Sequence, residues 1–415
     1  MSVLNHLDQL LNETPALYNL NNIIILIFTL IFVYFSHLIY KLFTFNEIVA
    51  DLSITKWNDK HFDLKRLYNR QDLPPHYPNG WFSVLESRDL KPNQIKPIDA
   101  FGVDLVVYRE LTGKVHVLDA YCPHLGANLA IGGRIIGDSV RCPFHGWTFN
   151  SKGVCTQVPG LECANLPKVQ IKVWECVEEN GFIFVWHHSE GEEANWFPIQ
   201  IPEISQSKLV YRGRAEHIVK CHLQEIPENG ADVQHLNELH EGPEFLGTVV
   251  NRSKFYNFVT KFLRYDWRAN WQPCPAPDQH IAHMDLRSTY SLFGYPLMPF
   301  SLDVLQIGPA NVHLKLTIHF LGEMNGYIIQ TITPLGPLKN KIVHHFYTEP
   351  TFKSFLFSKF MIYGEARMVE RDIVIWNNKK FLKQPYFAKH ETPLVKFRRW
   401  FSQFYTDKCP KHEDW

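Results

Sequence analysis

The sequence lacks an excess of charge of either sign, a disulfide framework, internal repeats and low-complexity segments. Its 42 Lys and Arg residues balance its 42 Asp and Glu residues, so no net field attracts nucleic acid, and we expect no nucleic-acid partner. The eight cysteines are scattered, which is typical of a protein from a reducing compartment. With 415 residues, the chain is long enough for two or three domains.

Charge is also absent from one long stretch near the N-terminus. Between Glu13 and Lys41 lie 27 residues without Asp, Glu, Lys or Arg. Eighteen helical residues, 23–40, would span about 27 Å, close to the ~30 Å hydrocarbon core of a bilayer. A secretory signal peptide would begin with basic residues, whereas this segment is preceded by Asp8 and Glu13. A buried core helix is the other alternative. We predict a membrane anchor at about 23–40, within an N-terminal segment that covers residues 1–45.

The charges that follow this segment predict its orientation. Five basic residues come after it: Lys41, Lys56, Lys60, Lys65 and Arg66. Basic residues flank membrane helices mainly on the cytoplasmic side, so we expect the bulk of the protein in the cytoplasm. We expect the membrane to be that of the endoplasmic reticulum. Residues 46–75 form a polar connector.

Short alternating runs predict a small all-β domain over residues 76–190. Three strands are expected at residues 81–86, 105–110 and 115–121, separated by turn residues. Residues 171–188 form two further alternating runs around Asn180-Gly181, a strong hairpin signal.

A second domain is expected over residues 191–415. Residues 312–335 alternate on both sides of Asn325-Gly326, which predicts another hairpin. Residues 352–378 form a helix whose apolar residues share one stripe: Ile362, Ala366, Val369, Ile373 and Trp376. These patterns indicate the α+β class, with an antiparallel sheet flanked by helices.

A glycine-rich stretch in the first domain carries two Cys/His pairs. Cys122-Pro-His124 is followed, after 17 intervening residues, by Cys142-Pro-Phe-His145. A zinc site is the alternative, but Cys-x-His is too tight for the usual zinc knuckle. Two thiolates and two imidazoles on neighbouring loops suit a [2Fe–2S] cluster in which one iron has two Cys ligands and the other has two His ligands.

The second domain offers imidazole and carboxylate ligands for another metal. Asp232, His235 and His240 lie in one short helical segment, and such ligands are typical of non-haem Fe(II) sites that activate O₂. His235 and His240 are five residues apart, about 140° around a regular helix at ~100° per residue. Both can reach one ion only where the helix is irregular or ends.

The missing carboxylate should come from the late helix. Glu370 and Asp372 are both candidates, with Glu365 one turn earlier, and helical periodicity does not choose between them. His280 and His283 form another possible ligand pair. They lie among prolines without a helical frame, and we interpret them as structural.

Taken together, these motifs resemble those of the Rieske non-haem iron oxygenases. The Cys-x-His and Cys-x-x-His pairs match their cluster motif, and Asp232 to His240 matches their Asp-x-x-His-x4-His motif. The resemblance covers residues 76 to about 390 and implies Asp372 as the third iron ligand, with Glu370 as second choice. With its N-terminal anchor and late D-x-x-x-W-x-x-K helix, the chain is most similar to the Neverland family of cholesterol 7-desaturases.

The resemblance implies cofactors, substrate and partners. Cys122, His124, Cys142 and His145 would hold a [2Fe–2S] Rieske cluster, and His235, His240 and Asp372 would hold a mononuclear Fe(II). A sterol, expected to be cholesterol, would react with O₂ and two electrons from NAD(P)H. Because the chain lacks a dinucleotide-binding fingerprint, a separate reductase is implied. A sterol or ketosteroid hydroxylase of the same family and a membrane-tethered Rieske electron carrier are the alternatives.

The same resemblance assigns a role to Asp232. In these oxygenases the corresponding Asp lies between the two metal centres and reaches a cluster histidine of the adjacent subunit in a head-to-tail trimer. By position that histidine would be His145. A helix-capping or solvated Asp is the alternative for this residue.

Overall fold

The computed structural model describes residues 43–52, 73–243, 254–319 and 322–411, together with scattered positions between 25 and 40. The chain divides into two compact units, residues 1–46 and 47–415, which are considered separately. In the part that is described, no helix is both long enough and apolar enough to cross a bilayer. Half of the residues of the predicted anchor at 23–40 lie outside the described residues, and the anchor stays a prediction.

The first part of the larger unit is built of short strands in three small sheets, with orders β10-β5-β4-β3, β11-β12-β2 and β6-β7-β8-β9. The strands are β2 (Gly80–Glu86), β3 (Gln94–Ala100), β4 (Val103–Arg109), β5 (Val115–Asp119), β6 (Arg134–Ile136), β7 (Ser139–Arg141), β8 (Thr148–Phe149), β9 (Cys155–Gln157), β10 (Val173–Trp174), β11 (Cys176–Glu179) and β12 (Phe182–His187). This arrangement confirms the predicted mostly-sheet character. Asn180 and Gly181 form the β11–β12 turn with φ values of 49° and 85°, the left-handed conformations that a tight hairpin requires.

The second part is one eight-stranded sheet with the order β1-β13-β19-β18-β17-β16-β15-β14. Its strands are β1 (Glu47–Asp51), β13 (Val210–Val219), β14 (Leu263–Pro273), β15 (Ile281–Leu292), β16 (Tyr295–Ile307), β17 (Asn311–His319), β18 (Glu323–Gly336) and β19 (Lys339–Thr348). All neighbours are antiparallel except β1 and β13, which are parallel. The predicted antiparallel sheet is therefore confirmed. The sheet also includes β1, which comes from the segment that the sequence assigned to a connector.

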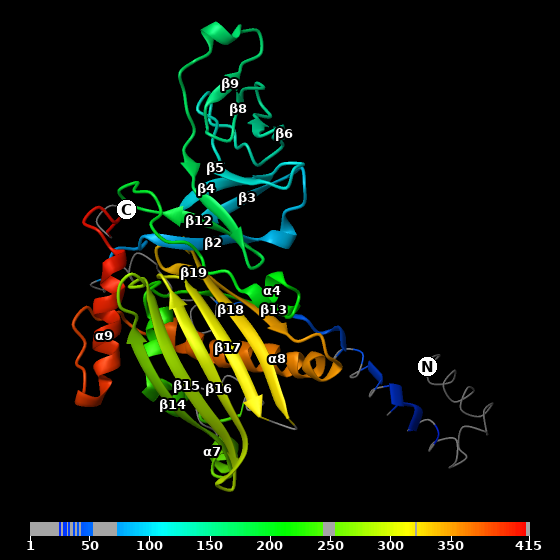
Figure 1. The fold of residues 1–415 in the computed structure, drawn as a ribbon, viewed down its shortest axis with the longest axis vertical. Helices are drawn as coiled ribbons and strands as arrows, with labels where there is room; N and C mark the ends of the chain where they lie inside the picture. The colour runs from blue at the N-terminus through cyan, green and yellow to red at the C-terminus, as the bar shows by residue number, and fades with distance from the viewer. Residues whose placement is uncertain are drawn as a thin grey trace, which may run out of the picture. The chain divides into compact units, whose positions relative to one another are not determined.

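Helices accompany this sheet, and the longest of them, α8, runs across one face (Figure 1). The helices are α4 (Pro202–Ser205), α5 (Glu225–Glu228), α6 (Val233–Leu239), α7 (Lys254–Thr260), α8 (Phe352–Trp376) and α9 (Thr392–Phe401). Thr351 begins α8 by accepting a hydrogen bond from the amide of Ser354. All five residues of the predicted apolar stripe are buried against the sheet side, so the helix and its inward face are confirmed.

One hairpin turn lies elsewhere than predicted. Strands β17 and β18 do form a hairpin, but its turn lies between His319 and Glu323, and Asn325-Gly326 lies inside β18. Gly322 has a φ of 97°, which explains how the chain reverses there. A Cβ at Gly326 would lie 2.8 Å from the terminal methyl of Met361 on α8, so this glycine gives the Met361 side chain room against the strand.

The two parts of the larger unit are joined through strand β2. Trp81 accepts a hydrogen bond at its carbonyl from Asn311, and Ser83 accepts one from Thr333. The buried carboxylate of Glu86 lies 2.7 Å from His345 and 2.7 Å from Arg214. A buried charge is tolerated only when it is paired in this way, so the contact fixes the small sheets against the large one.

Candidate metal centres

Two loops of nearly identical backbone geometry present the Cys/His pairs. In the first, the amide of Gly126 donates to the carbonyl of Cys122 at 2.9 Å; in the second, Gly146 donates to Cys142 at 3.2 Å. Both glycines have positive φ values, 70° and 72°, which side chains disfavour. The twin loops follow from glycines placed four residues after each cysteine, and the structure brings the four predicted cluster ligands to one place.

The two kinds of side chain face different surroundings. Cys122 and Cys142 are buried in the apolar core beneath the loops, whereas His124 and His145 are exposed. The two imidazole rings lie 4.7 Å apart, and Trp147 stacks on His124 at 4.6 Å. The imidazoles therefore lie at the outer edge of the site, where an electron partner can approach.

The surroundings of the Cys122 and Cys142 thiols favour binding of a cation. Burial raises the pKa of Cys122 to about 11, and the neighbouring Cys142 adds to the shift, while the backbone amides of His124 and Leu125 oppose it. Two adjacent buried thiols of this kind form thiolates readily only when a metal neutralises them. Amides aimed at a ligating sulfur also tune the potential of an iron–sulfur cluster. The residues present therefore fit a [2Fe–2S] cluster.

The second site is built where helix α6 ends. The helix stops at Leu239, and His240 is its C-cap with φ −110° and ψ 18°. This break resolves the five-residue spacing that a regular helix would not allow. The rings of His235 and His240 lie 5.4 Å apart and nearly perpendicular. Both imidazoles can thus face one point.

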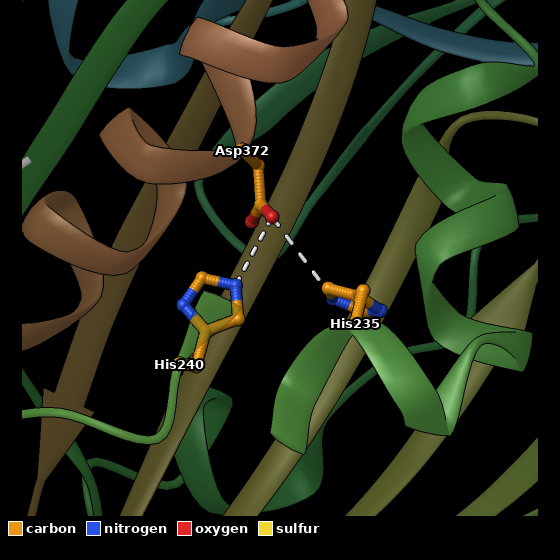
Figure 2. A group of neighbouring side chains, drawn as sticks. All are labelled: His235, His240 and Asp372. Atoms are coloured by element: carbon orange, nitrogen blue, oxygen red, sulfur yellow. Dashed lines mark hydrogen bonds and ion pairs between the residues drawn. The ribbon is translucent and has the colours of Figure 1, made fainter. Parts of the chain in front are cut away.

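Asp372 is the third member of the group. It lies on helix α8, 132 residues after His240 in the sequence. Its Oδ1 lies 3.0 Å from Nε2 of His240 and 4.0 Å from Nε2 of His235. Figure 2 shows the three side chains pointing toward one another from two separate elements. The ligand atoms that these three residues offer all lie within 4.8 Å of one another, close enough for one metal ion.

Several contacts hold these elements in place. The side chain of Asn237 donates to and accepts from the backbone of Trp267 on β14 at 3.1 and 3.0 Å. The buried guanidinium of Arg371 donates to the carbonyls of Gly242 and Pro243, each at 2.8 Å. Arg371 thus ties α8 to the segment that follows His240. The sequence did not identify Asn237, Trp267 or Arg371 as site residues, and the one signal was an arginine next to Asp372 in the predicted helix 352–378.

Asp232 is the N-cap of α6. Its Oδ1 accepts hydrogen bonds from the amides of Gln234 and His235 at 3.1 and 3.2 Å. The Asp232 backbone carbonyl accepts from Nδ1 of the His235 ring, while Oδ2 lies 3.9 Å from that nitrogen. Holding the proton on Nδ1 leaves Nε2 of His235 as the ligand atom. Asp232 therefore caps helix α6 through Oδ1, and its other carboxylate oxygen, Oδ2, takes no part in the cap.

The other candidate ligands lie apart from this group. Glu370 bonds to Arg367 and lies 3.8 Å from His217, and Glu365 lies 3.5 Å from His344. His280 stacks on Trp196 at 4.7 Å, and His283 pairs with Asp303 at 2.6 Å. Geometry thus separates Asp372 from Glu370, which periodicity alone could not do.

Two cavities of different character meet at Asp372. The inner cavity lies between α8 and the sheet and is lined mainly by apolar residues, among them Trp271, Met284, Val304 and Val369. The second cavity also has charged and polar side chains in its lining, among them Asp232, His235, Glu238 and Lys379. A metal at this point would border both cavities.

The donor set and its spacing fit a mononuclear iron. Ligand atoms ~2.1 Å from one ion and at right angles to each other lie about 3 Å apart, which matches the His240–Asp372 distance of 3.0 Å, while the His235–Asp372 distance is longer, at 4.0 Å. Two imidazoles and one carboxylate that leave other positions open form the facial triad of non-haem Fe(II) sites. Burial lowers the pKa of His235 and thus keeps this ligand neutral.

Comparisons with known proteins agree with this picture. Residues 80–175 match the model of the Rieske [2Fe–2S] domain, and residues 185–405 match that of the 3-ketosteroid 9α-hydroxylase C-terminal domain. A cholesterol 7-desaturase of Xenopus laevis is 41% identical over 352 residues, 84% of this chain and 76% of that protein. One of Bombyx mori is 42% identical over 344 residues, 82% and 72% of the two chains.

More distant relatives share the fold. The oxygenase component of a 3-ketosteroid-9-alpha-monooxygenase from Rhodococcus rhodochrous is 29% identical over 348 residues, 80% of this chain and 85% of that one. The crystal structure of dicamba monooxygenase superimposes with a TM-score of 0.59 at 14% identity, over 80% of this chain and 98% of the other. At that identity the likeness shows the arrangement of both domains and nothing of the substrate.

Proposed function

This chain belongs to the cholesterol 7-desaturase family of Rieske oxygenases, and from that membership we propose that it converts cholesterol to 7-dehydrocholesterol. The observation that carries the proposal is the apolar inner cavity, which ends at the carboxylate of Asp372. A cavity lined mainly by apolar side chains suits an apolar ligand such as a sterol. Such an activity would serve steroid-hormone synthesis.

Each set of ligands has one task in this reaction. The cluster held by Cys122, Cys142, His124 and His145 would pass electrons, and the Fe(II) held by the triad would activate O₂ for abstraction of hydrogen from the B ring. The chain's own residues position these events. Asp232 fixes the His235 ring through its carbonyl, and Arg371 holds the segment that carries His240 against α8.

The site itself favours an oxygenase-type enzyme over an electron carrier. A carrier needs only the cluster loops, whereas the triad and its adjoining cavity serve a substrate. A hydroxylase of the same family remains the second candidate, because hydroxylation and desaturation begin with the same hydrogen abstraction. The relatives named cholesterol 7-desaturase, at 41% and 42% identity, favour desaturation.

The proposal includes partners and a location. Two electrons per turnover would come from NAD(P)H through a separate reductase. We place the protein at the endoplasmic reticulum membrane, attached through residues 23–40 with the catalytic part in the cytoplasm, on the strength of the charge-free segment and the basic residues after it. We further propose a homotrimer, in which Asp232 faces His145 of the next subunit. Both cluster histidines are exposed, as that contact requires.

Reconstitution tests the function directly. Purified protein would be loaded with iron and sulfide and incubated with cholesterol, O₂, NAD(P)H and a Rieske-type reductase, followed by mass analysis of the sterols. We expect a product two mass units lighter than cholesterol. A product sixteen units heavier would identify a hydroxylase. Oxidation of the reduced cluster with no change in any sterol would favour the electron carrier.

A further inference from the structure

Helix α7 of the catalytic domain presents aromatic side chains outward. Phe255 and Phe258 lie on the helix and Phe262 follows its end, and spacings of three and four place the three residues on one side. Phe255 and Phe258 are 65% and 60% exposed, whereas Tyr256 is buried. A helix that packs on a domain normally buries its apolar stripe. The pattern of α7 is therefore the reverse of the usual one.

The hairpin turn between β15 and β16 lies beside α7 (Figure 1). The ring of Phe293 in this turn lies 5.1 Å from the ring of Phe262, which lies 5.2 Å from that of Phe258. The amide of Phe293 also donates to the carbonyl of Phe262 at 2.6 Å. Helix and turn thus form one apolar surface, the aromatic tip, which consists of Phe255, Phe258, Phe262, Phe293, Tyr295 and Leu297.

The turn holds an aromatic residue in an unfavourable backbone conformation. Leu292 pairs with Tyr295, so the turn consists of Phe293 and Gly294, and their φ values are 53° and 81°. Turns of this kind favour Asn-Gly, because a bulky side chain is disfavoured at positive φ. The ring of Phe293 is 64% exposed, so burial within the chain offsets little of this strain. A contact outside the chain would explain why an aromatic residue stands here.

The charges around the aromatic tip are mainly positive. Residues 254–265 include no acidic residue, and residues 288–302 include no charged residue. Asp266, the first acidic residue after α7, lies 3.7 Å from Arg264. Three exposed basic residues lie along α7 and the start of β14: Lys254, Lys261 and Arg264.

We propose that the aromatic tip inserts into the surface of a membrane that contains anionic lipids. Aromatic side chains favour the boundary between headgroups and acyl chains. Basic residues beside them attract anionic headgroups, and each adds about fivefold to binding. This contact goes beyond the proposed function and does not depend on the predicted anchor. It would hold the catalytic domain itself against the bilayer, in which a substrate as apolar as a sterol is dissolved.

A second copy of the chain is the other occupant to consider. If two aromatic tips met, the basic residues of one copy would approach those of the other, and like charges facing each other across an interface are unfavourable. An anionic membrane attracts the same basic residues and offers apolar acyl chains to the rings. The charge around the aromatic tip therefore favours lipid over a second copy.

Quenching of fluorescence by lipid tests the proposal in the full chain. Tyr295 is 76% exposed, and Tyr295→Trp places a reporter on the aromatic tip. The metal-loaded protein is reconstituted into vesicles of phosphatidylcholine and phosphatidylserine, with or without bromine on the acyl chains, and wild-type fluorescence is subtracted. The added fluorescence should fall by about half in brominated vesicles, because insertion by ~5–10 Å brings the ring to the acyl chains.

A reporter on another exposed turn is the matched control. Leu111 is 77% exposed and lies between β4 and β5 in the cluster domain. The fluorescence that Leu111→Trp adds should be the same in brominated and unbrominated vesicles. Equal quenching of the two reporters would indicate adsorption over the whole surface and would overturn the proposal.

Further substitutions separate lipid contact from folding. Phe293→Asn, added to the Tyr295→Trp protein, removes the ring and supplies the residue that this turn prefers. It should leave the thermal unfolding midpoint unchanged or higher and reduce the quenching about twofold or more. Lys254→Gln combined with Lys261→Gln should reduce quenching only when phosphatidylserine is present. If Phe293→Asn lowered the midpoint and left the quenching unchanged, Phe293 would serve only to pack against Phe262, and the proposal would be wrong.

The remaining outcomes are equally decisive. A Tyr295→Trp reporter that bromine does not quench would overturn the proposal. If its emission also shifted with protein concentration, a second copy would occupy the aromatic tip. The measurement needs no turnover. If the reporter is quenched and cholesterol is not converted, the membrane contact stands and the proposed function fails.

Discussion

The two metal sites of this protein are assembled in opposite ways. The cluster site uses two loops within 24 residues of sequence, each closed by its own backbone hydrogen bond and its own positive-φ glycine. The triad site joins the end of α6 to the last turns of α8, with His240 and Asp372 132 residues apart. The first site is a local structure on a small sheet, and the second exists only when a whole domain has folded. The two should therefore respond differently to mutation and to pH.

The largest expected effect is the loss of one site without the other. Asp372→Ala removes the only carboxylate of the triad, so we expect loss of the mononuclear iron and a fall in turnover of at least about 1,000-fold, since the bound metal supplies the chemistry. The cluster should remain, because its ligands belong to a separate sheet. Iron per chain and the EPR signal of the reduced cluster would measure both.

Glu370→Ala is the control for this variant. Its carboxylate lies two residues away but bonds to Arg367 and faces His217. We expect the mononuclear iron to remain, with a modest loss of stability from the broken ion pair. Iron lost from Glu370→Ala and retained by Asp372→Ala would transfer the role of third ligand to Glu370.

The reverse experiment removes the cluster. Cys122→Ser replaces a buried thiol in the apolar core beneath the loops, and we expect loss of acid-labile sulfide and of the cluster's EPR signal. Turnover should cease because no electrons arrive, while about one iron per chain stays at the triad. Loss of both metals would show that the triad depends on the cluster domain and that the two sites are less independent than their construction indicates.

The contrast also explains what the sequence could predict. The geometry of the cluster site follows directly from the sequence spacing of Cys122, His124, Cys142 and His145. A local sequence pattern was therefore enough to predict this site. The choice of Asp372 over Glu370 depends on which side of α8 meets the end of α6, and that is set by tertiary packing. The same limit misplaced the β17–β18 turn, because Gly326 packs against Met361 on a helix far along the chain, a contact that no local pattern shows. Strands β2, β4 and β5, the β11–β12 hairpin and the stripe of α8 have local periodicity and were predicted correctly.

Acid should affect the two domains unequally. Burial lowers the pKa of His222 and His344 to about 3 and that of His313 to about 4 in the large sheet and its connections. In the small sheets, burial lowers that of His187 to about 3. The unfolded chain binds these protons near pH 6.5 and the folded chain does not. Their contribution to stability is therefore complete above pH 6.5 and lost as pH falls toward 4.

Each of these histidines should remove roughly 1.4 kcal/mol of stability per pH unit below 6.5. At pH 5.5 the catalytic domain, with at least three such residues, should lose about three times as much as the cluster domain. Hydrogen exchange, corrected for its intrinsic pH dependence, would compare peptides from β17–β19 with peptides from β2–β5. Equal losses of protection in both would contradict the prediction. His313→Gln removes one titrating ring and should reduce the loss in β17.

The smallest expected effect concerns Asp232, the residue proposed to link the two kinds of site. Its Oδ1 caps α6, and Oδ2 is not used by that cap. Asn also caps helices well, whereas Ala does not and costs about 1 kcal/mol. Asp232→Asn therefore preserves the end of α6 and the carbonyl contact to His235, and removes only the negative charge. Asp232→Ala removes both the cap and the charge.

If electron transfer depends on the negative charge of Asp232, Asp232→Asn and Asp232→Ala should have the same effect on reaction rates but different effects on binding of the mononuclear iron. Both should keep the cluster, and both should lose about 10- to 100-fold in turnover and in cluster re-oxidation by O₂ and substrate, the range for removing a carboxylate that supports a metal ligand. Only Asp232→Ala should also weaken binding of the mononuclear iron, because His235 lies in the first turn of α6. Rates must be compared at matched iron content. Normal rates for Asp232→Asn together with slow rates for Asp232→Ala would show that Asp232 acts only as a helix cap. The charge of Asp232 would then play no part in connecting the two metal sites.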